Sequence, residues 1–266
     1  MSRLLIASAC VAALGTAGLA AQTVRPSRDI VAAVAAPGRT PANRERDRYR
    51  HPAETLAFFG VKPTQTVIEF IPGGGWYTEI LAPMLKGRGR YVTLVPATQA
   101  ERLRTTLAGQ ATAYGAVPVQ TIDFKTGASS VPAGSADVVL TFRNVHNLLM
   151  QADPAVPARV FKAFHDALKP GGVLGVVDHR LPEGMDTARE TSSGYIKRST
   201  VIRLAEQAGF RLAGESEINA NPRDTHDHPE GVWTLPPTYR LKDVDRAKYA
   251  AIGESDRFTL KFVRVR

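Results

Sequence analysis

The sequence predicts an α/β protein, in which a mostly parallel sheet of about seven strands carries helices on both faces. Three observations lead to this fold class. Short apolar, β-branched runs alternate along the chain with segments whose apolar residues recur at helical spacing. The expected strand at 67–71 is followed by three consecutive glycines and then by a helix at 78–85. The unbroken apolar run at 173–177 is typical of a strand buried on both faces.

The glycine run between the first strand and its helix is the most informative segment. Glycine lets the backbone approach a ligand closely, and the start of a helix offers free N–H groups. Strand, glycine turn and helix in this order therefore indicate a nucleotide-type binding site. The alternative is an ordinary βα turn, but three glycines exceed what such a turn needs. The residues of the turn are Gly73, Gly74 and Gly75.

The remaining elements alternate as a parallel sheet requires. Pro52 in a first turn and Gly60 after the last residue mark a helix ahead of the first strand. The turn at 169–172, Lys-Pro-Gly-Gly, ends an amphipathic helix and precedes the buried strand. Further strands are expected at 87–95, 117–122, 135–142, 211–218 and 254–263, and helices at 50–59, 103–108, 157–168 and 200–207.

The run Glu69-Phe-Ile-Pro-Gly-Gly-Gly75 resembles motif I of class I S-adenosylmethionine (SAM) dependent methyltransferases, an acidic residue followed by Gly-x-Gly-x-Gly. Ile71 stands where the first glycine is usual, and Gly73 and Gly75 fill the other two positions. The longer run Gly-Gly-Gly-Trp-Tyr-Thr-Glu-Ile-Leu is similar to that of a group of exported predicted methyltransferases. The resemblance covers the chain from about residue 48 to its end. It implies one domain with a Rossmann-like, seven-stranded methyltransferase sheet.

The resemblance implies SAM as the cofactor. Asp123, at the end of the third strand, would meet the adenine amino group, although an Asx turn explains this residue equally well. The family usually ends the second strand with an acidic residue that holds the ribose hydroxyls, but here that place is taken by Val95. Thr98 and Gln99 are candidates to replace it. The cofactor-binding residues are then Glu69, Gly73, Gly74, Gly75, Asp123 and Asn144.

Polar residues follow the fourth and fifth strands. Asn144 and His146 come just after one strand, and Asp178-His179-Arg180 follows the other. Ligands of open α/β sheets bind at the carboxyl ends of the strands, so we expect these residues and the glycine turn to surround one pocket, together with Asp123. His146, His179 and Arg180 are the candidate catalytic residues, which would bind a small-molecule substrate or remove its proton. A capping or supporting role is the alternative for His146.

Two other functions remain open. A metal- or small-ligand-binding protein on the same scaffold would explain the histidines, with zinc, copper or nickel held by some of His146, His179, His226, His228, Asp178 and Asp224. The third possibility is a non-catalytic remnant with a role at the cell envelope. Val95 weighs against conventional SAM binding. So does export, because SAM is made in the cytosol and an unfolded exported chain cannot carry it.

The N-terminus predicts export. Residues 1–21 combine Arg3, an apolar run and small residues at the end, as a secretory signal peptide does. The only cysteine, Cys10, lies within this segment, so the mature chain would contain no disulfide. Residues 22–47 are polar and proline-containing and are expected to form a flexible leader to the domain at 48–266. We expect a periplasmic or secreted protein without a stable membrane anchor.

The charge distribution bears on partners. The chain has 266 residues, and its formal net charge is +9. The basic residues are scattered, apart from a cluster at Arg44, Arg46, Arg48 and Arg50, and no stripe of basic and aromatic residues follows. Nucleic-acid binding is therefore not expected, and a small molecule or a component of the cell envelope is the expected substrate. Nothing in the sequence indicates an oligomeric state.

Overall fold

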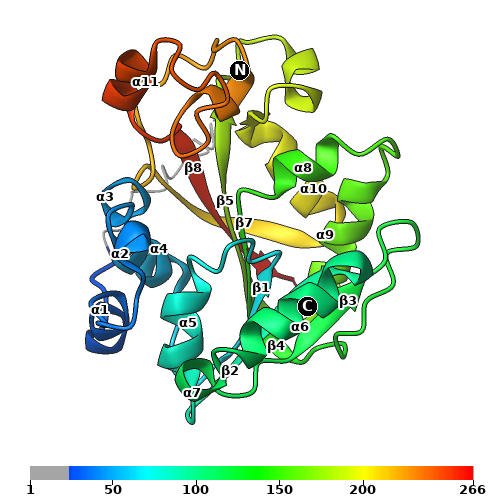
Figure 1. The fold of residues 1–266 in the computed structure, drawn as a ribbon. Helices are drawn as coiled ribbons and strands as arrows, with labels where there is room; N and C mark the ends of the chain where they lie inside the picture. Colours follow the sequence, from blue (N-terminus) through cyan, green and yellow to red (C-terminus); the bar gives the residue numbers. More distant parts are fainter. Residues whose placement is uncertain (1–23, 266) are drawn as a thin grey trace, which may run out of the picture.

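The computed structural model describes residues 24–265, which form one mixed sheet with helices on both faces (Figure 1). The strand order is β3-β2-β1-β4-β5-β8-β7, and β8 runs antiparallel to both of its neighbours while β1 to β5 are parallel. The predicted α/β fold class is confirmed. The strands are β1 Thr66–Phe70, β2 Arg90–Pro96, β3 Val119–Ile122, β4 Ala136–Phe142, β5 Leu168–Leu181, β6 Ile196–Lys197, β7 Phe210–Ser216 and β8 Arg257–Arg264, with the short β6 paired to the end of β5.

The helices cover the sheet because its strands are apolar on both sides. Val67 of β1 packs among residues of α1, α4 and α5, whereas the next residue, Ile68, packs among residues of α8, α9 and α10. No helix of the described residues is long and apolar enough to cross a membrane. The helices are α1 Arg28–Val34, α2 Pro41–Arg44, α3 Asp47–Arg50, α4 Pro52–Phe59, α5 Thr78–Leu85, α6 Ala97–Ala108, α7 Ala111–Tyr114, α8 Val145–Leu149, α9 Val156–Ala167, α10 Arg198–Gln207 and α11 Arg246–Ile252.

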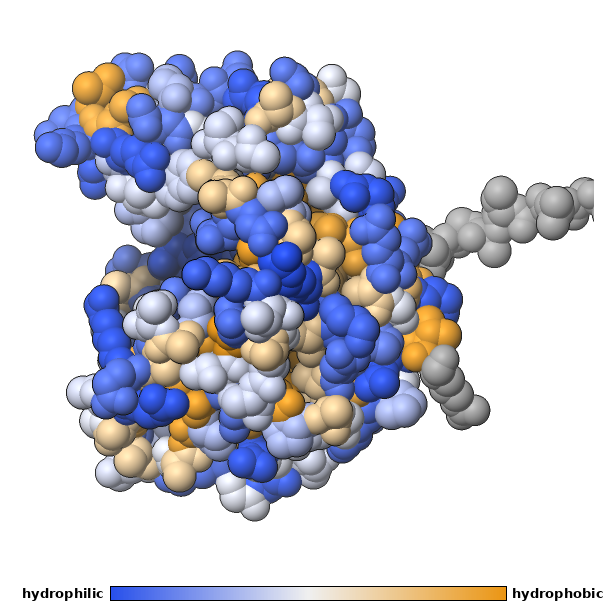
Figure 2. Space-filling view, turned by 90° about the vertical axis from the view of Figure 1, so that its right-hand side faces the viewer, coloured by the Kyte–Doolittle hydropathy of each residue, from blue (hydrophilic) through white to orange (hydrophobic). Residues whose placement is uncertain are grey.

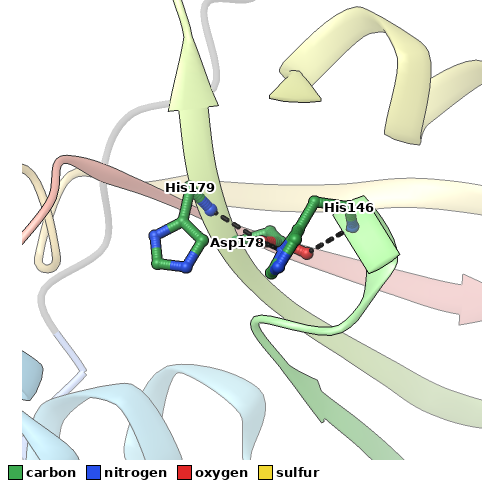
Figure 3. Close-up of side chains that lie close together, drawn as sticks. All are labelled: His146, Asp178 and His179. Atoms are coloured by element: carbon green, nitrogen blue, oxygen red, sulfur yellow. Dashed lines mark hydrogen bonds and ion pairs between the residues drawn. The ribbon is translucent and has the colours of Figure 1, made fainter. Parts of the chain in front are cut away.

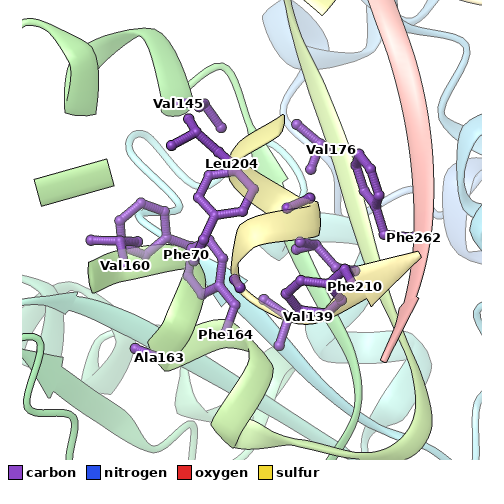
Figure 4. Close-up of a cluster of buried hydrophobic side chains, with 14 of the residues drawn as sticks. Phe70, Val139, Val145, Val160, Ala163, Phe164, Val176, Leu204, Phe210 and Phe262 are labelled. Carbon is purple, nitrogen blue, oxygen red and sulfur yellow. The ribbon is translucent and has the colours of Figure 1, made fainter. Parts of the chain in front are cut away.

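The larger hydrophobic core cluster lies between the sheet and helices α8, α9 and α10, and it holds the carboxyl edge of the strands in place. Phe70, at the end of β1, packs edge-on against Phe164 of α9, with ring centroids 5.0 Å apart (Figure 4). Leu204 of α10 and Val145 of α8 belong to the same cluster. The short helix α8 is thereby held directly after β4, so that its first residues stay at the carboxyl edge of the sheet.

The segment before the domain differs from the expected flexible leader. From Arg28 on it forms α1, α2 and α3, and Ile30 of α1 is buried against α4 and α5. The Arg39 guanidinium donates to both carboxylate oxygens of Asp47, at 2.6 and 2.8 Å, and to the carbonyl of Val34 at 2.9 Å. The buried Ile30 and the ion pair between Arg39 and Asp47 therefore hold this segment packed against the domain. The predicted signal peptide, 1–21, lies outside the described residues.

The long segment between β7 and β8 is built around one carboxylate. Asp224 accepts hydrogen bonds from the Tyr195 hydroxyl, the His228 Nε2 and the backbone N–H groups of His226 and Asp256, all at 2.8–3.0 Å. Two 3₁₀ turns, Thr187–Thr191 and Gly231–Thr234, lie in the same region as α11, in the upper part of Figure 1. The surface is hollowed between this upper part and the main body, and hydrophilic residues lie in the hollow (Figure 2).

Candidate functional site

The glycine turn after β1 separates two cavities. A smaller cavity of about 280 Å³ and a larger one of about 620 Å³ are both lined by Pro72, Gly73 and Gly74. Gly73 and Gly75 have φ values of 58° and 79°, which glycine adopts without strain. A Cβ atom on Gly73 or Gly74 would meet nothing within 4 Å, so the turn presents bare backbone to open space. This is the arrangement that close approach of a ligand requires.

Ile71 occupies the position at which the resembling family has its first glycine. Its φ is 48°, in the left-handed region that a β-branched residue rarely adopts. Its backbone N–H donates to the Leu94 carbonyl at 2.9 Å, and its side chain packs against the larger core cluster. Packing and hydrogen bonding thus hold a glycine-like turn in place although the residue is isoleucine.

Glu69 lies in β1, directly before this turn, and lines the smaller cavity. Its Oε2 accepts a 2.5 Å hydrogen bond from the Tyr91 hydroxyl, which also lies 2.8 Å from the Thr78 hydroxyl. Burial raises the pKa of Glu69 to about 7, against the opposing effect of the Tyr91 and Thr78 hydrogen bonds. A carboxyl that ionises near neutral pH beside a cavity is suited to a cationic ligand group.

His146, Asp178 and His179 come together at the carboxyl edge of the sheet (Figure 3). Asp178, in β5, is fully buried, and its carboxylate accepts hydrogen bonds from the backbone N–H groups of Val145, His146 and His179. Its Oδ1 also lies 2.7 Å from His146 Nδ1. A carboxylate only accepts hydrogen bonds, so Nδ1 donates, and in the neutral ring Nε2 keeps its lone pair. His146 lines the smaller cavity, and so it can act there as a proton acceptor.

His179 lines the same cavity, with its ring centroid 5.0 Å from that of His146. Its Nδ1 lies 2.5 Å from the Ser255 hydroxyl. Burial, together with the neighbouring His146, lowers the pKa of His179 well below its usual value, so this ring is neutral at pH 7. A neutral histidine bound to a hydroxyl can position a substrate but adds no charge.

The larger cavity lies between α5 and α6, on the other side of the glycine turn. Val95, Thr98 and Gln99 line it. The Val95 side chain is buried, but it faces this cavity at the carboxyl end of β2, at the position of the missing acidic residue. Thr98 and Gln99 supply the polar groups nearest to it in sequence.

Two of the sequence-predicted residues lie away from both cavities. The exposed Asp123 carboxylate accepts from the backbone N–H of Lys125 at 2.8 Å and from the Thr126 hydroxyl at 3.1 Å, which is an Asx-type turn. Those hydrogen bonds, led by that of Lys125, lower the pKa of Asp123. The Arg180 guanidinium donates to Glu217 at 2.5 Å and lies 3.4 Å from Asp256. Asn144, by contrast, lines the smaller cavity and donates to the Phe70 carbonyl at 2.9 Å.

The histidines of the metal hypothesis do not converge. His226 Nε2 lies 3.2 Å from Asp256 and His228 Nε2 lies 2.9 Å from Asp224, so each has its own carboxylate. His146, Asp178 and His179 offer ligand atoms within 4.8 Å of one another. The Asp178 oxygens, however, already accept four hydrogen bonds. A carboxylate occupied in this way supports the neighbouring histidine instead of binding an ion itself.

A group of arginines was not predicted as part of the site. Their side chains line the smaller cavity, and three of them surround the buried Glu254 carboxylate. Burial opposes ionisation of Glu254, but Arg257, Arg50 and Arg46 hold its pKa well below the usual range. In the sequence, Arg46 and Arg50 resemble surface charges of a leader. The residues are Arg46, Arg50, Arg143 and Arg257.

Comparison with known proteins supports the fold. No family model and no curated protein sequence matches this chain. A SAM dependent methyltransferase from Aquifex aeolicus is 16% identical, with a TM-score of 0.56 over 85% of this chain and 94% of that one. A putative sarcosine dimethylglycine methyltransferase from Galdieria sulphuraria is 16% identical, with a TM-score of 0.55 over 84% and 85%. The cyclase SpnF, 14% identical, has a TM-score of 0.55 over 84% and 81%. This chain therefore has the fold of these proteins, on which methyltransferases and a cyclase are built.

Proposed function

We propose that this protein is a SAM-dependent methyltransferase acting on a small molecule. The observation that carries the proposal is that one cavity is lined by Gly73 and Gly74 of the glycine turn, by the buried Glu69 and by His146, whose ring is held by Asp178. Part of a cofactor subsite and a proton acceptor thus border the same cavity. The similar solved structures, one described as a SAM dependent methyltransferase and one as a putative sarcosine dimethylglycine methyltransferase, support it at the level of the fold.

The residues around the glycine turn fit SAM. Open space beside Gly73 and Gly74 gives room for a ligand against the backbone, and Glu69 provides a carboxyl for a cationic group. Thr98 and Gln99 would hold the ribose in the larger cavity, since Val95 cannot. Bound there, SAM would supply an electrophilic methyl group for transfer to the acceptor.

His146 is the proposed base. Asp178 holds its ring through the 2.7 Å contact at Nδ1, which leaves Nε2 to take the proton from an acceptor hydroxyl or amine. The four hydrogen bonds to Asp178 keep this carboxylate from rotating away, so the histidine is held in one orientation. Asn144 and His179 complete the wall against which an acceptor would be positioned.

The acceptor is proposed to be small, because the smaller cavity has a volume of only about 280 Å³. One of the similar structures is described as a putative sarcosine dimethylglycine methyltransferase, whose name also indicates a small substrate.

Calorimetric titration with SAM and S-adenosylhomocysteine tests the cofactor. Both should bind, and Gly74→Val should abolish binding by filling the space beside the turn, while the exposed Gly184→Val should not. Methyl transfer is then followed with methyl-labelled SAM and pooled small-molecule acceptors. His146→Gln should lower turnover about 10²–10⁴-fold with SAM affinity unchanged. Absence of SAM binding in the natural protein would reject the proposed function.

We also propose export, from the signal-like residues 1–21. Sequencing the N-terminus of the protein recovered from separated cell fractions tests this. A mature protein that begins near residue 22 in the periplasm or medium is the expected result. A cytosolic protein that still carries Met1 would contradict it, and would also remove the difficulty of supplying SAM outside the cytosol.

A further inference from the structure

The wall of the smaller cavity carries four arginines from three separate parts of the chain. Arg46 and Arg50 come from the segment around α3, Arg143 follows β4, and Arg257 begins β8. Arg46 Nε and Arg50 Nε donate to Glu254 at 2.6 and 3.0 Å, and Arg257 donates to the same carboxylate. One carboxylate thus serves three guanidinium groups.

Several guanidinium nitrogens of this group have no hydrogen-bond partner. Among the described residues, Arg46 Nη2, Arg50 Nη2 and Arg257 Nε are buried and unpaired, and Arg50 and Arg257 are themselves almost fully buried. Arg143 makes no side-chain hydrogen bond or ion pair within residues 24–265. Buried polar groups are normally paired, and an arginine presents its donors in a planar fork suited to a carboxylate or a phosphate. The unpaired donors therefore indicate a missing acceptor.

The balance of charge at this wall also indicates a missing anionic group. Burial and the neighbouring Arg257 lower the pKa of Arg143 to about 10, so the group remains charged at neutral pH. Four positive guanidiniums are set against the Glu254 carboxylate, the Asp178 carboxylate that acts on Arg143, and the partly ionised Glu69, which leaves an excess of positive charge. SAM would not correct this excess, because its sulfonium and ammonium outweigh its single carboxylate. A second, anionic molecule would.

We propose that the methyl acceptor is an anion, with a carboxylate or phosphate group bound by Arg143 together with the free donors of Arg46, Arg50 and Arg257. This inference rests on the proposed function, and it adds the substrate class. Tyr77 and Phe142, which stack 3.6 Å apart and line the same cavity, provide an apolar surface for the rest of the molecule. The acceptor is therefore a small organic acid or phosphate ester.

The test uses benzoate and phenyl phosphate as probe anions, with benzamide and benzyl alcohol as neutral counterparts, at low salt. Both tryptophans of the chain, Trp76 and Trp233, line the cavity, so intrinsic fluorescence reports its occupation. The anions should quench the fluorescence saturably and the neutral molecules should not. Tighter binding of benzoate identifies a carboxylate site, and tighter binding of phenyl phosphate identifies a phosphate site.

Arg143→Gln is the decisive variant, because the Arg143 side chain forms no ion pair with the described residues whose loss would unfold the protein. It should weaken anion binding at least tenfold, whereas Arg211→Gln, at an exposed arginine of β7, should leave binding unchanged. Equal binding of benzoate and benzamide, or unaltered binding by Arg143→Gln with an unchanged circular dichroism spectrum, would overturn the proposal.

A separate titration with SAM distinguishes failure of the anionic acceptor from failure of the proposed methyltransferase function. Anion binding without SAM binding rejects the methyltransferase function alone, and SAM binding without anion binding rejects the anionic acceptor alone.

Discussion

Glu69, which lies directly before the glycine turn, is a buried carboxyl, and its ionisation makes the stability of the protein depend on pH. Burial raises the pKa of Glu69 from 4.5 to about 7, so between these values the folded protein keeps a proton that the unfolded chain has released. Glu69 should therefore lower stability as pH rises through this window, by up to about 3 kcal/mol, with no further effect above pH 7. The lowered pKa of His179 acts in the opposite direction below pH 6.5, so the contribution of Glu69 is the difference between two proteins. Urea unfolding at several pH values should show a stability that rises more steeply, or falls less, with pH in Glu69→Gln than in the natural protein. Glu206→Gln, at an exposed position of α10, should keep the slope of the natural protein. Equal slopes between pH 5 and pH 7 in the natural protein and Glu69→Gln would contradict the assignment.

Val95 leads to a second prediction at this scale. Its side chain lines the larger cavity where an acidic residue would hold the ribose hydroxyls. A hydrogen bond to a charged group is worth about 1.5–3 kcal/mol, so Val95→Asp should tighten SAM binding about 10–100-fold. Calorimetric titration at constant salt measures this, and Val95→Asn separates charge from shape. If the natural protein binds SAM tightly and Asp adds nothing, Thr98 or Gln99 already supplies the contact.

At the scale of elements, the three short helices α1, α2 and α3 are part of the domain. Arg39 joins α1 to α3, because its guanidinium donates to the Val34 carbonyl and to the Asp47 carboxylate. The same guanidinium lies 5.2 Å from the ring centroid of Trp76. Arg39→Ala should therefore lower the free energy of unfolding by about 2–4 kcal/mol, because Asp47 loses its partner. The exposed Arg44 is the matched control, and Arg44→Ala should change stability by less than about 0.5 kcal/mol. Urea unfolding measures the free energy of unfolding of both variants. Equal losses of stability in Arg39→Ala and Arg44→Ala would mean that the segment is not packed on the domain.

For the whole molecule, Asp224 joins parts of the chain that are distant in sequence. It connects Tyr195, the segment 226–228 and the backbone just before β8. Asp224→Asn places an amide against these donors, so hydrogen exchange across 219–256 should quicken while the β1–β4 half of the sheet stays protected. Asp227→Asn, at an exposed position three residues on, should leave exchange unchanged. Exchange that quickens evenly over the whole chain would show that this segment is not an independent unit.

The sequence allowed part of this molecule to be predicted. The glycine turn and the meeting of His146 with Asp178 follow from local pattern, because parallel strands bring their carboxyl ends to one edge. The arginine group was missed because its members come from three distant segments and resemble ordinary surface charges. The turn expected at Lys-Pro-Gly-Gly is present as a bulge inside β5: Leu168 pairs with Ala136, pairing resumes at Val173 with Val138, and Gly171 between them has a φ of 77°. Helices and strands can be predicted from the pattern of neighbouring residues. Ion pairs between distant segments cannot, because they depend on how those segments pack against one another.

Glu254 has a consequence for the order in which the protein is made. Its partner Arg50 lies 204 residues earlier in the chain, and Arg257 follows three residues after it. A nascent chain that ends before Glu254 thus carries Arg46, Arg50 and Arg143 without their shared carboxylate, and their mutual repulsion opposes closure of the cavity. The segment from Glu254 to the end of β8 brings both the counter-charge and the final pairing of the sheet. Synthesis must therefore be almost complete before the binding site can exist.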